Sequence, residues 1–201
     1  MNCIAVNGSN FSSRSSLSKA FSAMTGMDLI VSAPYLSIVT KYKIDKEISK
    51  CQWPDSYVYC LGAFTQRIII EQKFENSYIS DSGVFNELCW LKCRYPQIEL
   101  VYERSMIQSL ENVIVDYALS HYDFIFHIDS NDPSDSTNQC LKQMYHYRNI
   151  KHHIIDATNR ENALNEMLGY MQVKPILSAK YALLNSCADI QLNEDIYENC
   201  N

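Results

Sequence analysis

Short apolar runs alternate along the chain with longer segments in which apolar residues recur every three or four positions. The runs predict strands, and the periodic segments predict the helices that separate them. We expect strands at residues 2–6, 28–32, 77–80, 123–128 and 152–156. We expect helices at about residues 14–24, 57–74, 84–94, 105–120, 137–147 and 159–171, the last of them capped by Asn159.

This order of elements predicts an α/β protein with a three-layer arrangement. Five short strands joined through helices form a mainly parallel sheet that is covered by helices on both faces. Ligands of such sheets bind beyond the carboxyl ends of the strands. We therefore expect the loop after the first strand, Asp81 after the third strand and Asp129 after the fourth strand to face one crevice.

The composition supports one folded domain. The chain has 201 residues, of which 47% are hydrophobic, so it is long enough to bury a core but too short for two ordinary domains. We assign residues 1–171 to this domain. Residues 172–201 follow the last predicted helix and form a C-terminal extension, whose acidic end either packs on the core or is loosely held.

Charge and hydropathy narrow the class of partner. The net charge is −6, and the sequence has no cluster of Lys and Arg that would suit nucleic acid or a membrane surface. No apolar stretch approaches the ~18 residues of a membrane-spanning helix, and the N-terminal residues lack the pattern of a signal peptide. We expect a cytoplasmic protein that binds neither nucleic acid nor membrane.

The eight cysteines favour buried free thiols over disulfides or a metal site. The spacing of the cysteines gives no CxxC pair, and no export signal is visible. Cys89 and Cys93 are four residues apart and share one face of a predicted helix. His152 and His153 are adjacent on a predicted strand, so they point to opposite faces of the sheet and are poor candidates for one metal.

The stretch "GSNFSSRSSL", residues 8–17, lies between the first strand and the first helix. A phosphate-binding loop at this place has the pattern G-x-x-x-x-G-K-[ST]. Gly8 and Ser15 match it, whereas Ser13 replaces the second glycine and Arg14 replaces the lysine. A side chain at the second glycine costs roughly 1–2 kcal/mol if the loop needs a positive φ there. Arg14 keeps the positive charge but presents a bulkier fork to phosphate.

Two interpretations of this stretch remain open. In the first, the backbone amides of Ser12–Ser15 and the N-terminus of the helix attract an anion such as phosphate. In the second, the stretch is a serine-rich turn between strand and helix in which Ser12 or Ser13 caps the helix. The place after the first strand and the spacing favour descent from a phosphate loop.

The stretch "GSNFSSRSSLSKAF" resembles the start of small P-loop kinases. The resemblance is to proteins related to ribosylnicotinamide kinase and, more distantly, to nucleoside and nucleotide kinases. The loops of this family resemble G-S-x-x-x-G-K-T-T-L. The positions that this chain keeps are Gly8, Ser9, Ser15, Ser16 and Leu17.

Two further stretches resemble the same family. In "YISDSGVFNELCW", residues 78–90, Asp81 matches the first acid of D-R-x-x-x-D, whereas Ser82 replaces the arginine and Asn86 replaces the second acid. "HYDFIFHIDSNDPSD" resembles the strand that precedes the mobile lid of the family. The lid of the family carries arginines, but here no basic residue follows before Lys142, and the nearest arginine is Arg148.

The resemblance implies a kinase that uses ATP or GTP with Mg²⁺ and acts on a small nucleoside-like molecule. It implies that Arg14 replaces the loop lysine and that Asp81 acts as a base or as a metal-orienting acid. Ser15 would bind Mg²⁺ with Asp81. The residues implied to bind the nucleotide are Gly8, Ser9, Ser12, Ser13, Arg14, Ser15 and Ser16.

The departures from the family pattern support an alternative. Phosphoryl transfer depends on positioning and on neutralising charge at the γ-phosphate, and an arginine clamp contributes on the order of 10³–10⁵ in rate. This chain has altered the loop lysine, the arginine after the third strand and the lid arginines. The alternative is a catalytically inactive pseudokinase that acts as an interaction or regulatory module with a protein partner.

Two pairs of charged residues have both a functional and a structural interpretation. "VYERSM" resembles the E-R-S motif of deoxynucleoside kinases, but Glu103 and Arg104 also suit an ion pair at a helix start. Glu71 and Glu75, four residues apart, either reach a substrate or lie on a solvated helix face. We favour the structural interpretation of both pairs.

Two further pairs near the predicted lid have both a functional and a structural interpretation. Asp129 and Asp132 either hold Mg²⁺ through water or belong to an ordinary turn. Tyr145 and Tyr147 either stack on a base or pack in the core, and packing is the default for tyrosine.

Overall fold

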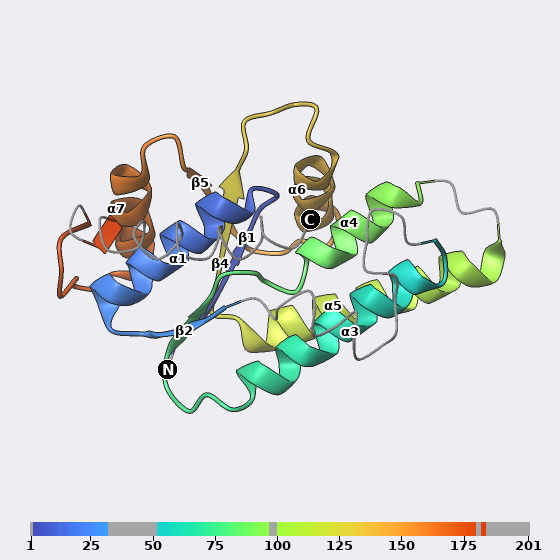
Figure 1. Cartoon of the computed structure of the whole chain (residues 1–201), viewed down its shortest axis with the longest axis horizontal. Helices are drawn as coiled ribbons and strands as arrows, with labels where there is room; N and C mark the ends of the chain where they lie inside the picture. The colour runs from blue at the N-terminus through green and yellow to red at the C-terminus, as the bar shows by residue number, and fades with distance from the viewer. Residues whose placement is uncertain (1, 32–51, 97–99, 180–181, 184–201) are drawn as a thin grey trace, which may run out of the picture.

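The sheet has five parallel strands in the spatial order β2-β3-β1-β4-β5 (Figure 1). The computed structural model describes residues 2–31, 52–96, 100–179 and 182–183. β1 is central, and its last residue, Asn7, pairs with His127 of β4. The strands are β1 (Cys3–Asn7), β2 (Asp28–Ile30), β3 (Tyr78–Ser80), β4 (Phe124–Asp129) and β5 (His153–Asp156).

The central strand β1 is apolar along most of its length because both faces of the sheet are covered. All five of its residues are buried. Cys3 and Ala5 contribute to one core cluster, whereas Ile4 and Val6 contribute to another on the opposite face. The alternation of a strand therefore divides one apolar run between two cores.

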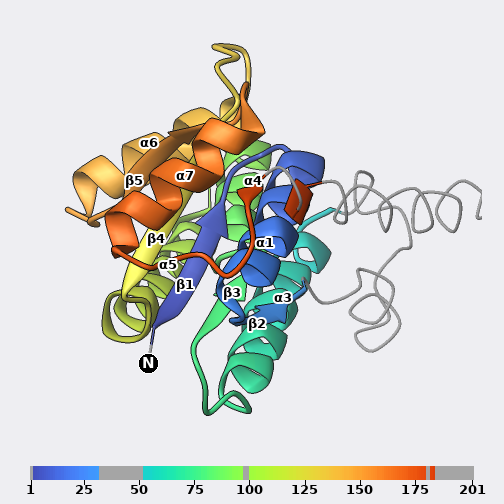
Figure 2. The ribbon, with the colours of Figure 1, turned by 90° about the vertical axis from the view of Figure 1, so that its left-hand side faces the viewer.

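Helices of the described residues form a layer on each side of the sheet. α1 and α7 pack with Ile4 and Val6, and Figure 2 shows these two helices in front of the sheet. α3, α4, α5 and α6 pack with Cys3 and Ala5 on the other face. The three-layer α/β arrangement is confirmed. The helices are α1 (Phe11–Thr25), α3 (Asp55–Glu71), α4 (Asn86–Arg94), α5 (Val101–His121), α6 (Ser136–Tyr147) and α7 (Arg160–Met171).

Every predicted strand and helix has a counterpart, but several boundaries differ. α1 begins at Phe11, three residues before the predicted start, and α3 ends at Glu71 rather than at residue 74. The predicted cap of α7 is confirmed, because the side chain of Asn159 accepts a hydrogen bond from the amide of Asn162. These elements place the first strand-to-helix connection at the carboxyl edge of the sheet.

The described part of the segment after α7 contacts α1. The amide of Ile176 donates to the carbonyl of Met24 at 2.6 Å, and Ala179 and Ala182 are buried in the cluster that α1 and α7 share. Residues 184–201 lie outside the described residues. None of the helices in the described ranges combines the length and the apolar character that a membrane span requires.

Candidate functional site

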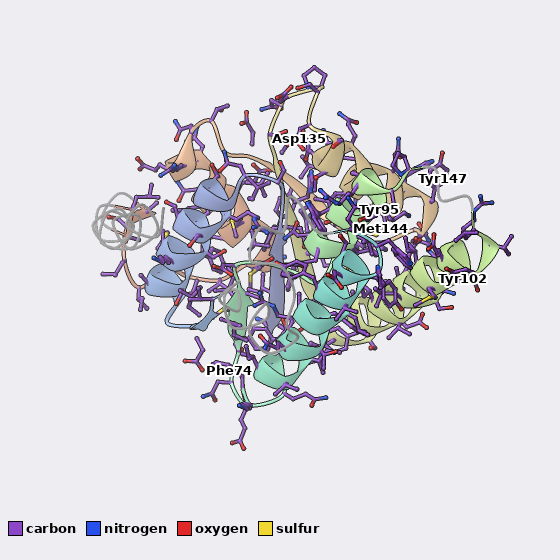
Figure 3. The ribbon with its side chains drawn as sticks, turned by 45° about the vertical axis from the view of Figure 1, so that its right-hand side comes forward. Phe74, Tyr95, Tyr102, Asp135, Met144 and Tyr147 are labelled. Carbon is purple, nitrogen blue, oxygen red and sulfur yellow. The ribbon has the colours of Figure 1, made fainter. Side chains whose placement is uncertain are left out.

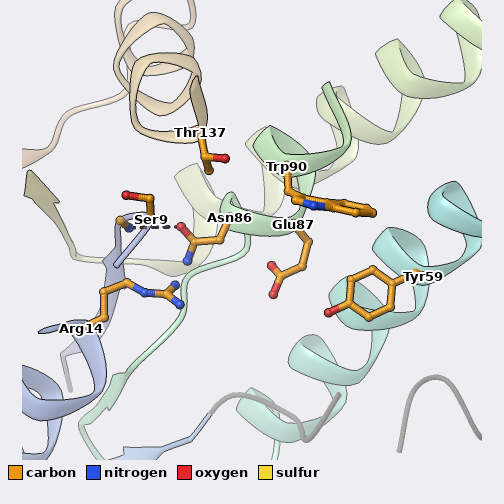
Figure 4. A pocket seen from close by; sticks show the side chains of 8 residues that line it. Ser9, Arg14, Tyr59, Asn86, Glu87, Trp90 and Thr137 are labelled. Carbon is orange, nitrogen blue, oxygen red and sulfur yellow. Dashed lines mark hydrogen bonds between the residues drawn. The ribbon is translucent and has the colours of Figure 1, made fainter. Parts of the chain in front are cut away.

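A pocket of about 250 Å³ opens at the carboxyl edge of the sheet, beside the end of β1 (Figure 4). The connection from β1 to α1 forms one side of the pocket, and α3, α4 and α6 contribute the others. This is the edge at which ligands bind in sheets of this kind. The lining residues are Gly8, Ser9, Arg14, Tyr59, Asn86, Glu87, Trp90 and Thr137.

Gly8 is required by the backbone at the end of β1. Its φ of +146° is rarely adopted by residues with a side chain, and a Cβ at this position would lie 2.6 Å from the carbonyl oxygen of Ile128. Its amide donates to Oδ1 of Asn86 at 3.1 Å. The first glycine of the motif thus lets the chain pass close to β4 and binds α4 directly.

The connection between β1 and α1 is shorter than the motif predicts. It consists of Gly8, Ser9 and Asn10, because α1 already begins at Phe11. Asn10 caps the helix by accepting a hydrogen bond from the amide of Ser13 at 2.9 Å, and its carbonyl accepts from the amide of Arg14 at 3.1 Å. The prediction that Ser12 or Ser13 is the cap is therefore wrong. The amides of Ser13 and Arg14 are already used inside the helix.

Ser9 contacts an acidic residue that the sequence analysis missed. Its hydroxyl donates to Oδ2 of Asp135, the residue before α6 (Figure 3). The other carboxylate oxygen of Asp135 accepts from the amide of Asn138 at 3.0 Å and caps α6. An aspartate three residues before this amide is a recognisable cap signal, but its contact with Ser9 is not. A negative charge therefore lies against the connection that should accept phosphate.

Arg14 lies in the first turns of α1 with its guanidinium turned toward the pocket (Figure 4). Only 6% of the residue is exposed, and Nη1 donates to Oγ of Ser82 at 3.1 Å. Burial lowers the pKa of Arg14, whereas the carboxylates of Glu87 and Asp81 oppose that change. The pocket therefore contains a buried guanidinium whose charged form two carboxylates favour.

The side chains of Ser82 and Asn86, which follow β3, connect Arg14 to Gly8 through hydrogen bonds. Nδ2 of Asn86 donates to Oγ of Ser82 at 3.0 Å, and Ser82 in turn accepts from Arg14. Asn86 also accepts from the amide of Gly8. Ser82 and Asn86 thus form one buried network with Gly8 and Arg14.

The structure brings some of the other predicted residues close to Arg14. Asp81 is 1% exposed, and its charge acts on Arg14. Ser15 is buried, and the hydroxyl of Ser16 accepts from Nη1 of Arg160 on α7 at 3.2 Å. The pocket described above is not lined by Asp81, Ser15 or Ser16. The side chain of Ser12 lies outside the described residues.

The wall of the pocket opposite Gly8 is aromatic and carries the acidic residue Glu87. The rings of Tyr59 on α3 and Trp90 on α4 lie 5.9 Å apart at 74°. Glu87, one turn before Trp90, points into the same opening as Arg14 (Figure 4). Sequence reasoning missed these three residues because each occupies an amphipathic helix, in which aromatic and charged positions are ordinary.

Asp129 lies at the end of β4 in an ion pair rather than in the pocket. It accepts hydrogen bonds from Nζ of Lys142 and from Nδ2 of Asn138, both at 2.8 Å. Partial burial raises its pKa, but these hydrogen bonds outweigh that effect and lower the pKa to about 2. Asp132 accepts from Ser134 within an exposed turn, as the structural interpretation predicted. Among the described residues, no group of three His, Cys, Asp or Glu side chains suits a metal ion.

This ion pair predicts a loss of stability in acid. The carboxyl of Asp129 has a folded pKa of about 2, below its ordinary value of 3.8. Its contribution is therefore present above pH 4 and is lost as the pH falls toward 2. Urea unfolding at pH 6 and pH 2.5 should show a smaller acid-induced loss in Asp129→Asn than in the wild type. Asp116→Asn, at an exposed position of α5, is the control, and an equal loss in all three proteins would contradict the role of Asp129.

The remaining candidates do not line the pocket. Glu103 and Arg104 lie at the start of α5, the place in a helix that the structural interpretation gave them. Glu71 contradicts the prediction of a solvated face, because it is 1% exposed and accepts hydrogen bonds from Tyr117 and Tyr122. Glu75, by contrast, is exposed and follows the end of α3.

Tyr145 and the two adjacent histidines pack against other rings, whereas Tyr147 does not pack in the core. Tyr145 is buried and stacks on His152 with ring centroids 4.3 Å apart, whereas Tyr147 is 80% exposed at the other end of α6 from Asp135 (Figure 3). His153 packs on Tyr170 of α7 at 3.9 Å. The two adjacent histidines therefore point to opposite faces of the sheet, as predicted.

Comparison with known proteins shows the fold. No protein family and no curated protein matches the chain. A structure of deoxyadenosine kinase from M. mycoides with bound dATP matches with a TM-score of 0.58 and 14% identity, over 85% of this chain and 99% of that chain. The same kinase with bound dCTP matches with a TM-score of 0.58 and 13% identity, over 85% and 98% of the two chains. The chain therefore has a nucleoside kinase-like P-loop fold.

Proposed function

We propose that this protein is a divergent nucleotide-binding kinase whose pocket takes a nucleoside-like substrate. The observation that carries the proposal is the make-up of the pocket. Gly8, Ser9 and Arg14 form one end, and Tyr59 and Trp90 form the other. A cation beside an aromatic wall suits a molecule with an anionic or phosphate-accepting end and a flat heterocycle.

The size of the pocket supports a nucleoside rather than a whole nucleoside triphosphate. Its volume of about 250 Å³ is slightly below the roughly 300–1,000 Å³ of most small-molecule sites. The Glu87 carboxylate in the same opening would accept hydrogen bonds from an amino group of a base. Structures with this fold were determined with dATP and dCTP, nucleotides of two such bases.

The phosphoryl donor would be ATP or GTP, bound with Mg²⁺ along residues 8–16. Arg14 would neutralise charge on the transferred group, which is a large part of catalysis in this chemistry. Asp81 would act on the acceptor hydroxyl as a base, or would orient the metal with Ser15. Protein ligands need be few, because Mg²⁺ keeps several waters and takes further oxygens from the phosphates.

A specific observation favours the second candidate, an inactive pseudokinase with a protein partner. The Asp135 carboxylate accepts a hydrogen bond from Ser9, at the place where phosphate would bind. The amides of Ser13 and Arg14 are also used by Asn10. Both features reduce the capacity of this connection for an anion, since carboxylate and phosphate repel each other.

One experiment separates the two candidates. Thermal unfolding is measured with nucleosides, ATP, GTP and dNTPs, with and without Mg²⁺, for the wild type and Asp135→Asn. Asparagine caps a helix as well as aspartate does, so the variant removes the charge but keeps the cap. The kinase proposal predicts a Mg²⁺-dependent rise with nucleotide and a separate rise with nucleoside.

The variant is expected to increase the nucleotide affinity about threefold to tenfold, because the repulsion of phosphate is removed. Asp132→Asn, three residues away in the exposed turn, should leave the affinity unchanged. No rise in either protein at millimolar ligand would exclude the kinase and leave the interaction module. A rise in Asp135→Asn alone would show a competent site that the aspartate blocks. Transfer of labelled phosphate to the nucleosides that bind would then identify the acceptor.

A further inference from the structure

Three cysteines come together where α4 packs on α6, behind the Trp90 wall of the pocket. Cys89 and Cys93 occupy one face of α4, as their spacing predicts, and Cys140 lies on α6. Sγ of Cys93 donates to the carbonyl of Ser136 at 3.2 Å, one turn before Cys140. All three are free thiols. Figure 1 shows the two helices side by side.

The three thiols differ in accessibility. Cys89 is buried in the core cluster between the helices and the sheet, whereas Cys93 and Cys140 are half-buried. Lys92 lies on α4 between the two cysteines and is held by Glu111 of α5 at 2.7 Å. A small reagent can therefore reach Cys93 and Cys140 but not Cys89. A lysine charge close to a thiol favours the thiolate, which is the reactive form.

The contacts within the cluster single out Cys140 as the nucleophile. Hydrogen bonds from Cys89, the Lys92 charge and a hydrogen bond from Cys93 outweigh burial and lower the pKa of Cys140 to about 7. Burial instead raises the pKa of Cys89 and of Cys93. The surroundings of the cluster thus favour the thiolate of Cys140 over the thiolates of its two neighbours.

We propose that Cys140 and Cys93 form a thiol–disulfide exchange site that reacts with low-molecular-weight disulfides. The Cys140 thiolate attacks one sulfur of the disulfide RSSR, forms a mixed disulfide and expels RS⁻. Cys93 gives its proton to the expelled RS⁻ and then attacks Sγ of Cys140, which expels the second RS⁻. This second RS⁻ takes from the solvent the proton that Cys140 released when it ionised. The two protein thiols are oxidised to one disulfide, and RSSR is reduced to two RSH.

The product connects two walls of the pocket. Cys93 lies one turn after Trp90 on α4, and Cys140 lies one turn after Thr137 on α6. A bond between them closes the chain segment from residue 93 to residue 140. Because this restricts the unfolded chain, the oxidised protein should melt roughly 5–10 °C above the reduced protein. This inference does not depend on the proposed kinase function.

The test uses the full chain and oxidised glutathione as the probe. After incubation at pH 7.5, free thiols are alkylated, and peptide mapping follows Cys93 and Cys140. The expected product is a Cys93–Cys140 disulfide that dithiothreitol reverses. Cys93→Ser should stop at the mixed glutathione disulfide on Cys140, and Cys140→Ser should leave Cys93 unmodified. Cys60→Ser, which removes a buried thiol of α3, should react as the wild type does.

A second measurement tests the cluster without forming the disulfide. The alkylation rate of Cys140 against pH should have a midpoint near 7 in Cys93→Ser, where no disulfide can form with residue 93. Cys89→Ala should lower the rate at pH 7 about threefold, because this variant lacks the thiol that favours the Cys140 thiolate. A midpoint near 9, a disulfide that joins Cys89 to Cys140, or an intact pair of thiols after prolonged incubation would each overturn the proposal.

Discussion

Arg14→Met is expected to weaken nucleotide binding about 30-fold and to remove the thermal shift that nucleotide causes. Methionine has a long side chain but no charge, so the variant deletes the guanidinium that turns toward the pocket. A hydrogen bond to a charged group contributes about 1.5–3 kcal/mol, and 2 kcal/mol corresponds to about 30-fold in Kd. Calorimetric titration of each protein with nucleotide in the presence of Mg²⁺ measures the change in Kd.

Two variants show whether the loss belongs to the charge at this site. Arg14→Lys restores the lysine of the phosphate-loop pattern, and it should bind nucleotide within about fivefold of the wild type because the positive charge is kept. Arg67→Met removes another buried arginine, which bonds to Oγ of Ser80 at 2.9 Å but does not line the pocket. This control should lose stability and still bind. Normal binding by Arg14→Met would show that the guanidinium has a structural role only.

Gly8→Ala is expected to reduce the free energy of unfolding by about 2–4 kcal/mol. The φ of +146° is strained for alanine, and the new Cβ would lie 2.6 Å from a carbonyl oxygen and 3.1 Å from Cβ of Ile128. Ile128 belongs to β4, so its backbone cannot move away without disturbing the pairing with β5. Urea unfolding of the purified variant measures the loss.

Gly169→Ala is the matched control for this variant. Gly169 lies inside α7, and among the described residues no heavy atom other than those of the neighbouring residues and the surrounding helix backbone lies within 4 Å of the position of a new Cβ. Alanine is the better helix former, so this variant should gain about 0.5–1 kcal/mol. If Gly8→Ala unfolded with the same midpoint as the wild type, the close approach of the β1–α1 connection to β4 would be wrong. Comparison of the two variants also shows whether Gly8 is needed for the stability of the fold as well as for the candidate site.

Local patterns were sufficient for the elements of the fold. The apolar run of β1, the periodicity of α7 and the Asn159 cap depend on neighbours in the sequence, and all three were predicted. Parallel pairing could also be predicted, because two parallel strands need a crossover connection and helices separate the strands in this sequence. The start of α1 could not be predicted, since asparagine and serine are similar caps and the stretch contains both.

Local sequence patterns did not predict which polar side chains are buried. Glu71 has the spacing of a surface residue, yet Tyr117 of α5 and Tyr122, the residue after α5, cover it and donate to its carboxylate. The partners lie 46 and 51 residues away in the chain, so no window around Glu71 indicates them. The same holds for Asp135, whose contact with Ser9 joins residues 126 positions apart.

The sequence by itself determined the α/β class, the place of the first connection at the carboxyl edge, and one end of the candidate site, Gly8 and Arg14. Only the tertiary structure decided the other end, where Tyr59, Glu87 and Trp90 meet the loop. The physical reason is that a motif on one connection is contiguous, whereas a pocket wall is assembled from separate helices. Each helix carries its residue in an ordinary amphipathic pattern, and packing alone brings those residues together.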